Sequence, residues 1–514
     1  MKRTRQMTNT LLSTLRRRPL FNPRRSCAAA CMAVFMAALL LLLLSGCTVG
    51  PDYRRPETQV PSRYSPSAGA AGGFPGPAAD TELARWWRVF DDPVLNRLVE
   101  EASATNLDLK LAEARIRQAR AARAVAGGGL GPTLDAAGSY KRSQTPATSA
   151  DGRDISVYND QYQAGFDAGW EIDIFGGQHR NLEAADADLL AAVESRRDVL
   201  VSLTAEVARN YIQLRTFQQQ IAITRKNLAA QQHSSKLTRE RFEGGFVGGL
   251  DVANAQAQTA TTAAQIPLLE SSARQAIYSL SVLLGQPPAA LEARLTPEGA
   301  IPGAPPDVPL GVPSDLLRRR PDIRQAEARI HAATARIGVA AAELYPKFTI
   351  TGAVGYQASD FGGWFDGSSQ FWSFGPSAIW RLFESGRIRA GVEVQKALQE
   401  QEVLTYRKTV LGALQEVENA LVASAKEQEH RQSLTEAVAA NRKAVTLAEK
   451  LYTEGLTDFI NVLQAQQALF GTENALVQST ADLSTDLVAL YKALGGGWQQ
   501  TPVAQAETRL PAPH

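Results

Sequence analysis

Two long stretches of the chain carry apolar residues at every seventh position. The first covers residues 178–243, which contain neither Gly nor Pro, and the second covers residues 387–454. The heptad positions are Val193, Leu200, Val207, Leu214, Ile221 and Leu228 in the first stretch, and Val403, Val410, Val417, Val438, Val445 and Tyr452 in the second. At a rise of about 1.5 Å per residue, each stretch predicts a helix roughly 100 Å long. A seven-residue repeat predicts supercoiled packing against neighbouring helices. We expect each helix to turn at a glycine-rich corner and return through residues 250–284 and 459–494.

Shorter segments with a period of two precede both long helices. In residues 348–357, Phe348, Ile350, Val354 and Tyr356 alternate with polar residues and glycine. Residues 161–174 and 372–382 show the same alternation, with aromatic side chains on one face. The pattern predicts a pair of strands in each half, apolar on one face and polar on the other. A length of about 10 to 13 residues suits tilted membrane strands, and a sheet over a soluble core is the alternative.

The sequence contains an internal repeat, in which the second half follows the pattern of the first. Residues 114–116 and 328–330 are both Ala-Arg-Ile, and each opens a matching block that ends at a proline, Pro132 or Pro346. Gly245 and Asp251-Val252 in the first half correspond to Gly455 and Asn461-Val462 in the second. Each half is expected to begin with a helix, at residues 107–126 and 314–342. An internal repeat of two long copies accounts for a chain too long for one compact core.

The first residues form a targeting segment. Residues 1–25 contain eight basic and no acidic residues, an apolar run covers 27–44, and Leu44-Ser45-Gly46-Cys47 follows. This arrangement is a secretory signal, and its last four residues match the bacterial lipobox. The match implies cleavage before Cys47 and attachment of lipid to its sulfur and new amine, which anchors a protein firmly. An uncleaved transmembrane anchor is the alternative, since 18 apolar residues nearly span a bilayer. Thr48 carries no inner-membrane retention signal, so the outer membrane is the expected location.

We therefore expect six segments. These are a signal peptide (1–46), a lipidated extension (47–84), a first repeat (85–290), a proline-rich linker (291–313), a second repeat (314–495) and a disordered tail (496–514).

Charge and cysteine content narrow the class of protein. The precursor is formally +2 and loses eight basic residues with its signal, so the mature chain is about −6, which argues against a nucleic-acid partner. Cys27 and Cys31 leave with the signal, so no disulfide is expected. Beyond Cys47 no apolar run reaches 18 residues, so the chain is expected to cross the outer membrane as strands of a closed barrel. Four strands cannot close a barrel and eight leave a filled interior, so several copies are needed. Physical reasoning alone does not fix three copies over four.

Several blocks of sequence carry a family resemblance. The mature start (47–56), the block Leu316–Ile323 and the block Ala340–Pro346 resemble the NodT branch of the TolC-like outer-membrane efflux factors. The resemblance implies an α+β membrane protein: a homotrimer with a 12-stranded outer-membrane β-barrel, continued by a 12-helix periplasmic α-barrel. It implies an exit duct for drugs or other small toxic compounds, with a periplasmic adaptor and an inner-membrane pump of the resistance-nodulation-division kind as partners. A duct for type I protein secretion and a structural coiled-coil lipoprotein without a pore are the alternatives.

The resemblance also places a periplasmic gate at the helical corners. It implies that Asp251 and Tyr452 hold the mouth shut. The family's inner acidic ring falls here on the neutral Asn461 and Gln464, so an apolar constriction by Phe459 or Ile460 is a further candidate. Helix capping is the alternative for Asp251 and heptad packing for Tyr452.

Docking to the adaptor is predicted at the same corners. The candidate residues are Gly244, Gly245, Gly455, Leu456 and Thr457, although a tight turn alone would explain the glycines. Five scattered histidines and no phosphate-binding loop beside a strand make an enzyme, a metal site or a cofactor other than the lipid unexpected. The short block Arg318–Asp322 is expected to start a helix, with Pro321 in its first turn.

Overall fold

The computed structural model describes residues 48–64, 83–148, 154–303 and 313–499. These residues form two compact units, a sheet unit built mainly from residues 129–180 and 338–389, and a helical unit that contains the rest. The predicted signal peptide, Cys47 and residues 500–514 lie outside the described residues.

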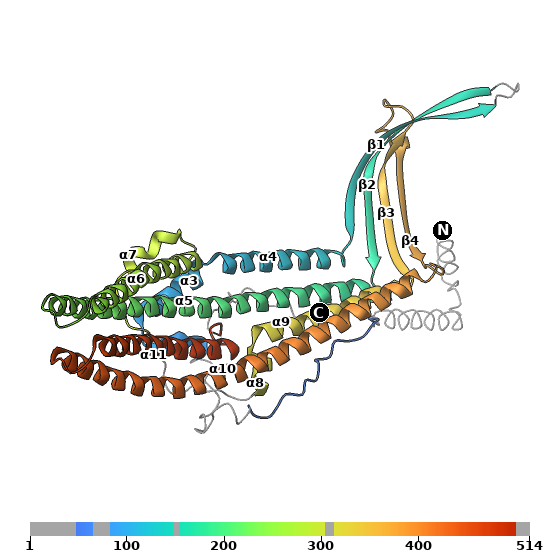
Figure 1. The fold of residues 1–514 in the computed structure, drawn as a ribbon. Helices are drawn as coiled ribbons and strands as arrows, with labels where there is room; N and C mark the ends of the chain where they lie inside the picture. Colours follow the sequence, from blue (N-terminus) through green and yellow to red (C-terminus); the bar gives the residue numbers. More distant parts are fainter. Residues whose placement is uncertain (1–47, 65–82, 149–153, 304–312, 500–514) are drawn as a thin grey trace, which may run out of the picture. The chain divides into compact units, whose positions relative to one another are not determined.

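The sheet unit is a four-stranded antiparallel sheet in the order β1-β2-β3-β4 (Figure 1). Its strands are β1 (Thr133–Thr148), β2 (Asp154–Ile172), β3 (Lys347–Ala358) and β4 (Gln370–Ile379), with a short turn η4 (Gly367–Ser369) before β4. β2 from the first half of the chain pairs directly with β3 from the second. β1 and β2 are 16 and 19 residues long, longer than predicted, because they continue as a two-stranded ribbon past the end of β3.

The register confirms one apolar and one polar face. Phe166 lies opposite Val354, which lies opposite Trp372, and the neighbouring residue Asp167 points to the other face. Phe166 and Trp372 are 55% and 76% exposed in the single chain. Strand pairing ends earlier than predicted, at Ile172 and Ile379, so that Ile174, Trp380 and Leu382 lie outside the strands. The reason is that β3 starts after Pro346, which has no N–H to continue a ladder.

Four long helices dominate the helical unit and form two hairpins (Figure 1). The first hairpin is α5 (Gly177–Glu243) with α6 (Gly249–Leu283), and the second is α10 (Arg387–Thr453) with α11 (Phe459–Ala493). Both outgoing helices have 67 residues and both returning helices have 35. These bounds lie within two residues of the predicted ones. Among the described residues, no helix is long and apolar enough to cross a membrane.

Shorter elements lie beside the long helices (Figure 1). α4 (Leu107–Gly128) and α9 (Pro321–Ala342) are the helices predicted to open each half, but α9 is preceded by a separate α8 (Pro313–Arg319). The predicted single helix is broken at Arg320, because Pro321 cannot donate a helical hydrogen bond. The short η3 (Pro288–Leu291) lies at the boundary between the predicted first repeat and the predicted linker, and α7 (Glu292–Leu295) lies within the linker.

Two elements were not predicted. η2 (Trp86–Phe90) and α3 (Pro93–Thr105) precede α4. Asp92 caps α3 by accepting hydrogen bonds from Val94 N and Leu95 N, and its other oxygen accepts from the Tyr211 hydroxyl at 2.8 Å.

The largest apolar core lies where the middle parts of α5 and α10 and the C-terminal parts of α6 and α11 meet η2 and α3. Heptad residues Leu214 and Val417 are completely buried in it, and Trp86 stacks on Tyr491 with 5.4 Å between ring centroids. The chain end contributes too. Trp498 lies over Arg197 and donates a hydrogen bond to Arg319 O at 3.1 Å, so residues 496–499 are packed rather than disordered as predicted.

Candidate functional site at the helical hairpin tips

The two hairpin corners have the same backbone geometry. Gly245 and Gly455 have φ angles of 76° and 78°, in the left-handed region. Phe246 N donates to Arg241 O, and Leu456 N donates to Leu451 O, each at 2.9 Å. A left-handed residue followed by this bond is the Schellman ending of a helix, which favours Gly. The geometry of the turn alone therefore explains these two glycines, without any contact to a partner.

Exposed apolar side chains surround both corners. Phe246 and Leu250 on the first corner are 77% and 73% exposed, and Leu456 on the second is 70% exposed. Of the other predicted docking residues, Gly244 lies beneath the Phe246 ring, and Thr457 accepts a hydrogen bond from Asn461 Nδ2 at 2.8 Å. The predicted docking residues thus gather at two corners that present apolar side chains to solvent.

Tyr452, predicted in the gate, is buried between the hairpins. Its hydroxyl donates to Thr238 Oγ1 on α5 at 3.2 Å, and its ring lies 5.5 Å from that of Phe459. Phe459 is only 2% exposed, whereas the next residue, Ile460, is 44% exposed. The prediction that Phe459 narrows an opening is therefore wrong for this chain, because its ring fills the hairpin core. Ile460 is the apolar candidate that reaches the surface.

Asp251 does not cap α6. The N-cap is Gly248, and Asp251 lies in the first turn, where its charge favours the helix dipole. Within the described chain, Asp251 and Tyr452 share no hydrogen bond. Asn461 and Gln464 are exposed on α11.

Arg241 was missed by the sequence analysis. Its Nη1 donates to Tyr452 O at 2.7 Å and to Thr453 O at 3.2 Å, and its guanidinium carbon lies 4.8 Å from the centre of the Tyr452 ring. Arg241 thus joins the end of α5 to the end of α10. The heptad search could not find it, because that search scored apolar residues only.

The block Arg318–Asp322 has a structural role, as expected. Pro321 opens α9, and Asp322 accepts a hydrogen bond from Ile323 N at 2.8 Å. Arg320 is nearly buried and donates to Asp322, to Glu416 Oε2 at 2.7 Å and to Ala493 O at 2.9 Å. This one side chain therefore ties α9 to α10 and to the end of α11.

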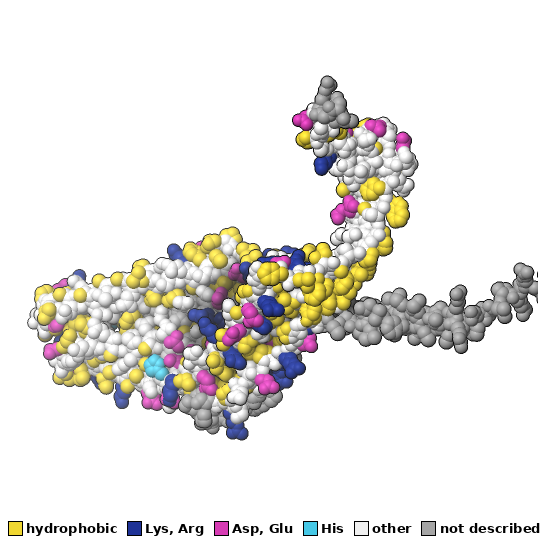
Figure 2. Space-filling model, turned by 90° about the vertical axis from the view of Figure 1, so that its right-hand side faces the viewer, with side chains coloured by type: hydrophobic (Ala, Val, Ile, Leu, Met, Phe, Trp, Pro, Cys, Tyr) yellow, Lys and Arg dark blue, Asp and Glu magenta, His cyan; other side chains and the backbone are white. Residues whose placement is uncertain are grey.

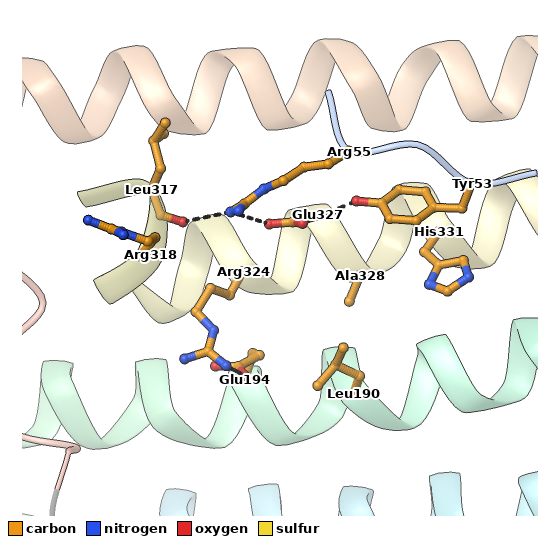
Figure 3. Close-up of a pocket in the computed structure, with 10 residues that line it drawn as sticks. All are labelled: Tyr53, Arg55, Leu190, Glu194, Leu317, Arg318, Arg324, Glu327, Ala328 and His331. Carbon is orange, nitrogen blue, oxygen red and sulfur yellow. Dashed lines mark hydrogen bonds and ion pairs between the residues drawn. The ribbon is translucent and has the colours of Figure 1, made fainter. Parts of the chain in front are cut away.

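A cavity of about 310 Å³ lies beside the N-terminal segment (Figure 3). Its charged side chains are mostly paired: Glu327 accepts from Arg55 at 2.9 Å and from the Tyr53 hydroxyl at 3.2 Å. Burial raises the pKa of Glu194 even though Arg324 and Arg197 both contact it. The bonds of Tyr53 and Arg55 to Glu327 therefore fix the N-terminal segment on the helical unit.

Charges are mixed on the molecular surface. Figure 2 shows basic and acidic side chains near one another on the face in view rather than in separate patches. Across the part of the chain that the structure describes, no group of three His, Cys, Asp or Glu side chains is arranged to hold a metal ion.

Comparison with known proteins gives a consistent result. The family model described as "Outer membrane efflux protein" matches residues 98–286 and 312–496. Nodulation protein T of Rhizobium leguminosarum bv. trifolii is 31% identical over 90% of this chain and 97% of its own length. The probable efflux pump outer membrane protein TtgC of Pseudomonas putida is 33% identical over 93% of this chain and 98% of its own. Among solved structures, the outer-membrane channel OprN is 37% identical with a TM-score of 0.81, covering 88% of this chain and all of that one.

Proposed function

Because the chain belongs to the outer membrane efflux protein family, we propose that three copies form one continuous duct through the outer membrane and into the periplasm. The protein is the outer-membrane exit duct of an efflux pump and extends into the periplasm. The trimer, its twelve strands and its twelve tunnel helices are the proposed assembly.

The observation that carries this proposal is the two-faced sheet. Its apolar face, with Phe166 and Trp372, is exposed in a single chain, while its other face carries Asp167 and Glu171. A barrel with lipid outside and water inside needs this arrangement. The sheet also has two edges, β1 and β4, that cannot remain unpaired in lipid. Edge pairing between copies satisfies both requirements.

Aromatic residues bound the apolar face at both ends. Tyr162 lies at one end, with its ring 5.7 Å from Phe361 and 5.8 Å from Trp364, and Trp170 lies at the other. The eight residue steps from Tyr162 to Trp170 span roughly 26 Å at about 3.3 Å per residue. That length suits an apolar band about 25 Å tall between two aromatic girdles.

The proposal includes a lipid anchor at Cys47 and two protein partners. A periplasmic adaptor and an inner-membrane pump of the resistance-nodulation-division kind would deliver small toxic compounds to the duct. The exposed apolar corners, with Phe246 and Leu456, support docking of the adaptor there. The surface residues Asp251, Ile460, Asn461 and Gln464 are the proposed lining of the gate.

Deletion and complementation test the function. A strain without the gene should become sensitive to compounds that its pump exports, and the wild-type gene should restore resistance. The purified protein should have the native mass of a trimer and conduct ions in planar bilayers. A monomer that conducts no ions would contradict the duct.

A further inference from the structure

The buried side of α5 changes character towards the hairpin tip. Up to Ile221 it is largely apolar, and residues such as Val207 and Leu214 are completely buried. From residue 222 to the end of the helix, every buried residue is polar: Thr224, Asn227, Gln231, Ser234 and Thr238. Their spacing of three and four keeps them on one helical face. We call this face the polar seam.

The polar seam faces the second hairpin. Gln466 Nε2 on α11 donates to Ser234 Oγ at 3.0 Å, and Asn227 Nδ2 lies 3.5 Å from Glu473 Oε2. Tyr452 on α10 donates to Thr238. Beyond Ile221 the buried face of α5 therefore contacts the second hairpin through hydrogen bonds. A small apolar cluster lies beside them at the tip, where Leu237 and Ala255 of the first hairpin pack with Tyr452 and Phe459 of the second.

The bond between Tyr452 and Thr238 has a defined direction. The Thr238 hydroxyl donates its proton to Ser234 O at 2.9 Å, so its oxygen is left to accept the proton of Tyr452. A phenol has only one proton to donate. In this closed arrangement Tyr452 therefore cannot also donate to Asp251 of a neighbouring copy.

Arg241 completes the contact at the end of the seam. The last carbonyls of a helix lack partners within it and carry partial negative charge. Arg241 donates to two of these carbonyls on α10, Tyr452 O and Thr453 O, and its cation lies over the Tyr452 ring. A residue of the first hairpin thus caps a helix of the second.

We propose that Arg241 and Thr238 form a latch within each chain that positions Tyr452 and keeps the two hairpin tips together in the closed duct. The inference rests on the proposed function as a gated duct. When a partner separates the tips, water can take over the hydrogen bonds of the polar seam, so the apolar surface that becomes exposed is limited to the small cluster around Tyr452 and Phe459. The apolar core around Val207 stays closed and serves as the pivot. Arg241 and Thr238 are positioning residues, since they act through Tyr452.

Matched substitutions test the latch. Thr238→Val keeps the shape but removes the acceptor, whereas Thr238→Ser keeps the acceptor. Arg241→Ala removes the cap, whereas Arg241→Lys keeps the charge. Arg241→Ala should raise the open probability of the purified channel in planar bilayers by on the order of tenfold, the factor expected for one charge-assisted bond. Thr238→Val should raise it by about fivefold, because the bond between two neutral hydroxyl groups is weaker. Thr238→Ser should behave as wild type, and Arg241→Lys should lie in between.

Assembly is measured alongside by native mass and outer-membrane fractionation. Trimeric Arg241→Ala and Thr238→Val channels with wild-type open probability would overturn the latch. Complementation by the wild-type gene is measured separately. If the wild-type gene does not restore resistance, the proposed duct function has failed, and not only the latch.

A bridge across the polar seam provides a second test that does not depend on a destabilised variant. Ser234→Cys with Gln466→Cys places two thiols in a chain whose other cysteines are in the signal or at the lipidation site. A cleavable bifunctional thiol reagent should stop efflux, and reduction should restore it. Either single variant treated in the same way is the control. Unchanged efflux in the bridged protein would show that the seam does not open.

Discussion

Arg320 brings a positive charge into the core where α9, α10 and α11 meet. Its side chain is 10% exposed and bonds to Asp322, Glu416 and a backbone carbonyl of Ala493. Removing it would leave two carboxylates and one carbonyl without their donor. The Glu416 carboxylate is 57% exposed and that of Asp322 is 25% exposed, so water partly solvates both charges once Arg320 is removed, and the loss is mainly that of its hydrogen bonds.

We expect Arg320→Ala to lower the free energy of unfolding by about 1.5–3 kcal/mol, the range for hydrogen bonds to charged groups. Arg318→Ala is the matched control, because Arg318 is 72% exposed and pairs only with Asp315. Its effect should stay within about 0.5 kcal/mol. Chemical unfolding of the detergent-solubilised protein measures both. An equal loss of unfolding free energy in the two variants would contradict the proposed role of Arg320 in holding α9, α10 and α11 together.

Asp486 gives a prediction about pH. Burial, and then the nearby Asp482 and Glu427, raise its pKa to about 6 from the ordinary 3.8. Because the folded state then binds this proton more tightly than the unfolded state, the contribution of Asp486 to stability falls as pH rises through this window. Asp486→Asn should therefore raise the thermal midpoint at pH 7.5, and this advantage should vanish by pH 4. An advantage that is independent of pH would exclude the titration.

At the hairpin corners, the same residues can be required for the turn of the hairpin and for binding a partner. Gly455 must adopt a left-handed conformation, and a Cβ added there would lie 3.6 Å from Arg241 Nη2. A substitution at Gly455 therefore strains the turn, whatever its effect on a partner, while its Cβ makes only an ordinary contact with Arg241. Leu456, which is 70% exposed, is the better probe of docking.

We expect Gly455→Ala to cost about 1 kcal/mol through backbone strain. Leu456→Ser should leave the thermal midpoint unchanged but reduce resistance in cells and cross-linking to the adaptor. The measurements are thermal unfolding, minimal inhibitory concentrations and cross-linking from the corner. Normal resistance with Leu456→Ser would remove this leucine from the docking surface.

Sequence periodicity predicted the long elements well because each repeats one simple rule many times. The heptads locate α5 and α10 within one or two residues, and alternation assigns Phe166 and Trp372 to the same face. Periodicity did not predict features that depend on contacts between residues far apart in the sequence. Nothing local reveals that Arg241 caps a helix more than 200 residues away, or that Phe459 is covered by Tyr452. The polar seam was missed because its residues take the places that a heptad search reserves for apolar side chains.

For the whole molecule, the main consequence is that one chain is incomplete. Its four strands leave two edges without partners, and its apolar face is exposed. In the proposed assembly, lipid covers this face and neighbouring copies pair with the two edges. Two independent features therefore direct the protein to the membrane: the strands, and the acyl chains proposed at Cys47.

How much the strands and the acyl chains each contribute to membrane attachment can be measured. Replacing residues 1–47 by a signal peptide without a lipobox removes the acyl chains but leaves the sheet intact. We expect this protein to remain in the outer-membrane fraction as a trimer, because several strands bury far more apolar surface than a few acyl chains. Adding Phe166→Asp on the apolar face should reduce its recovery there, since a charge facing lipid is destabilising, whereas Asp167→Asn on the polar face should not. Release of the unlipidated protein into the periplasm would instead mean that the lipid is the main anchor.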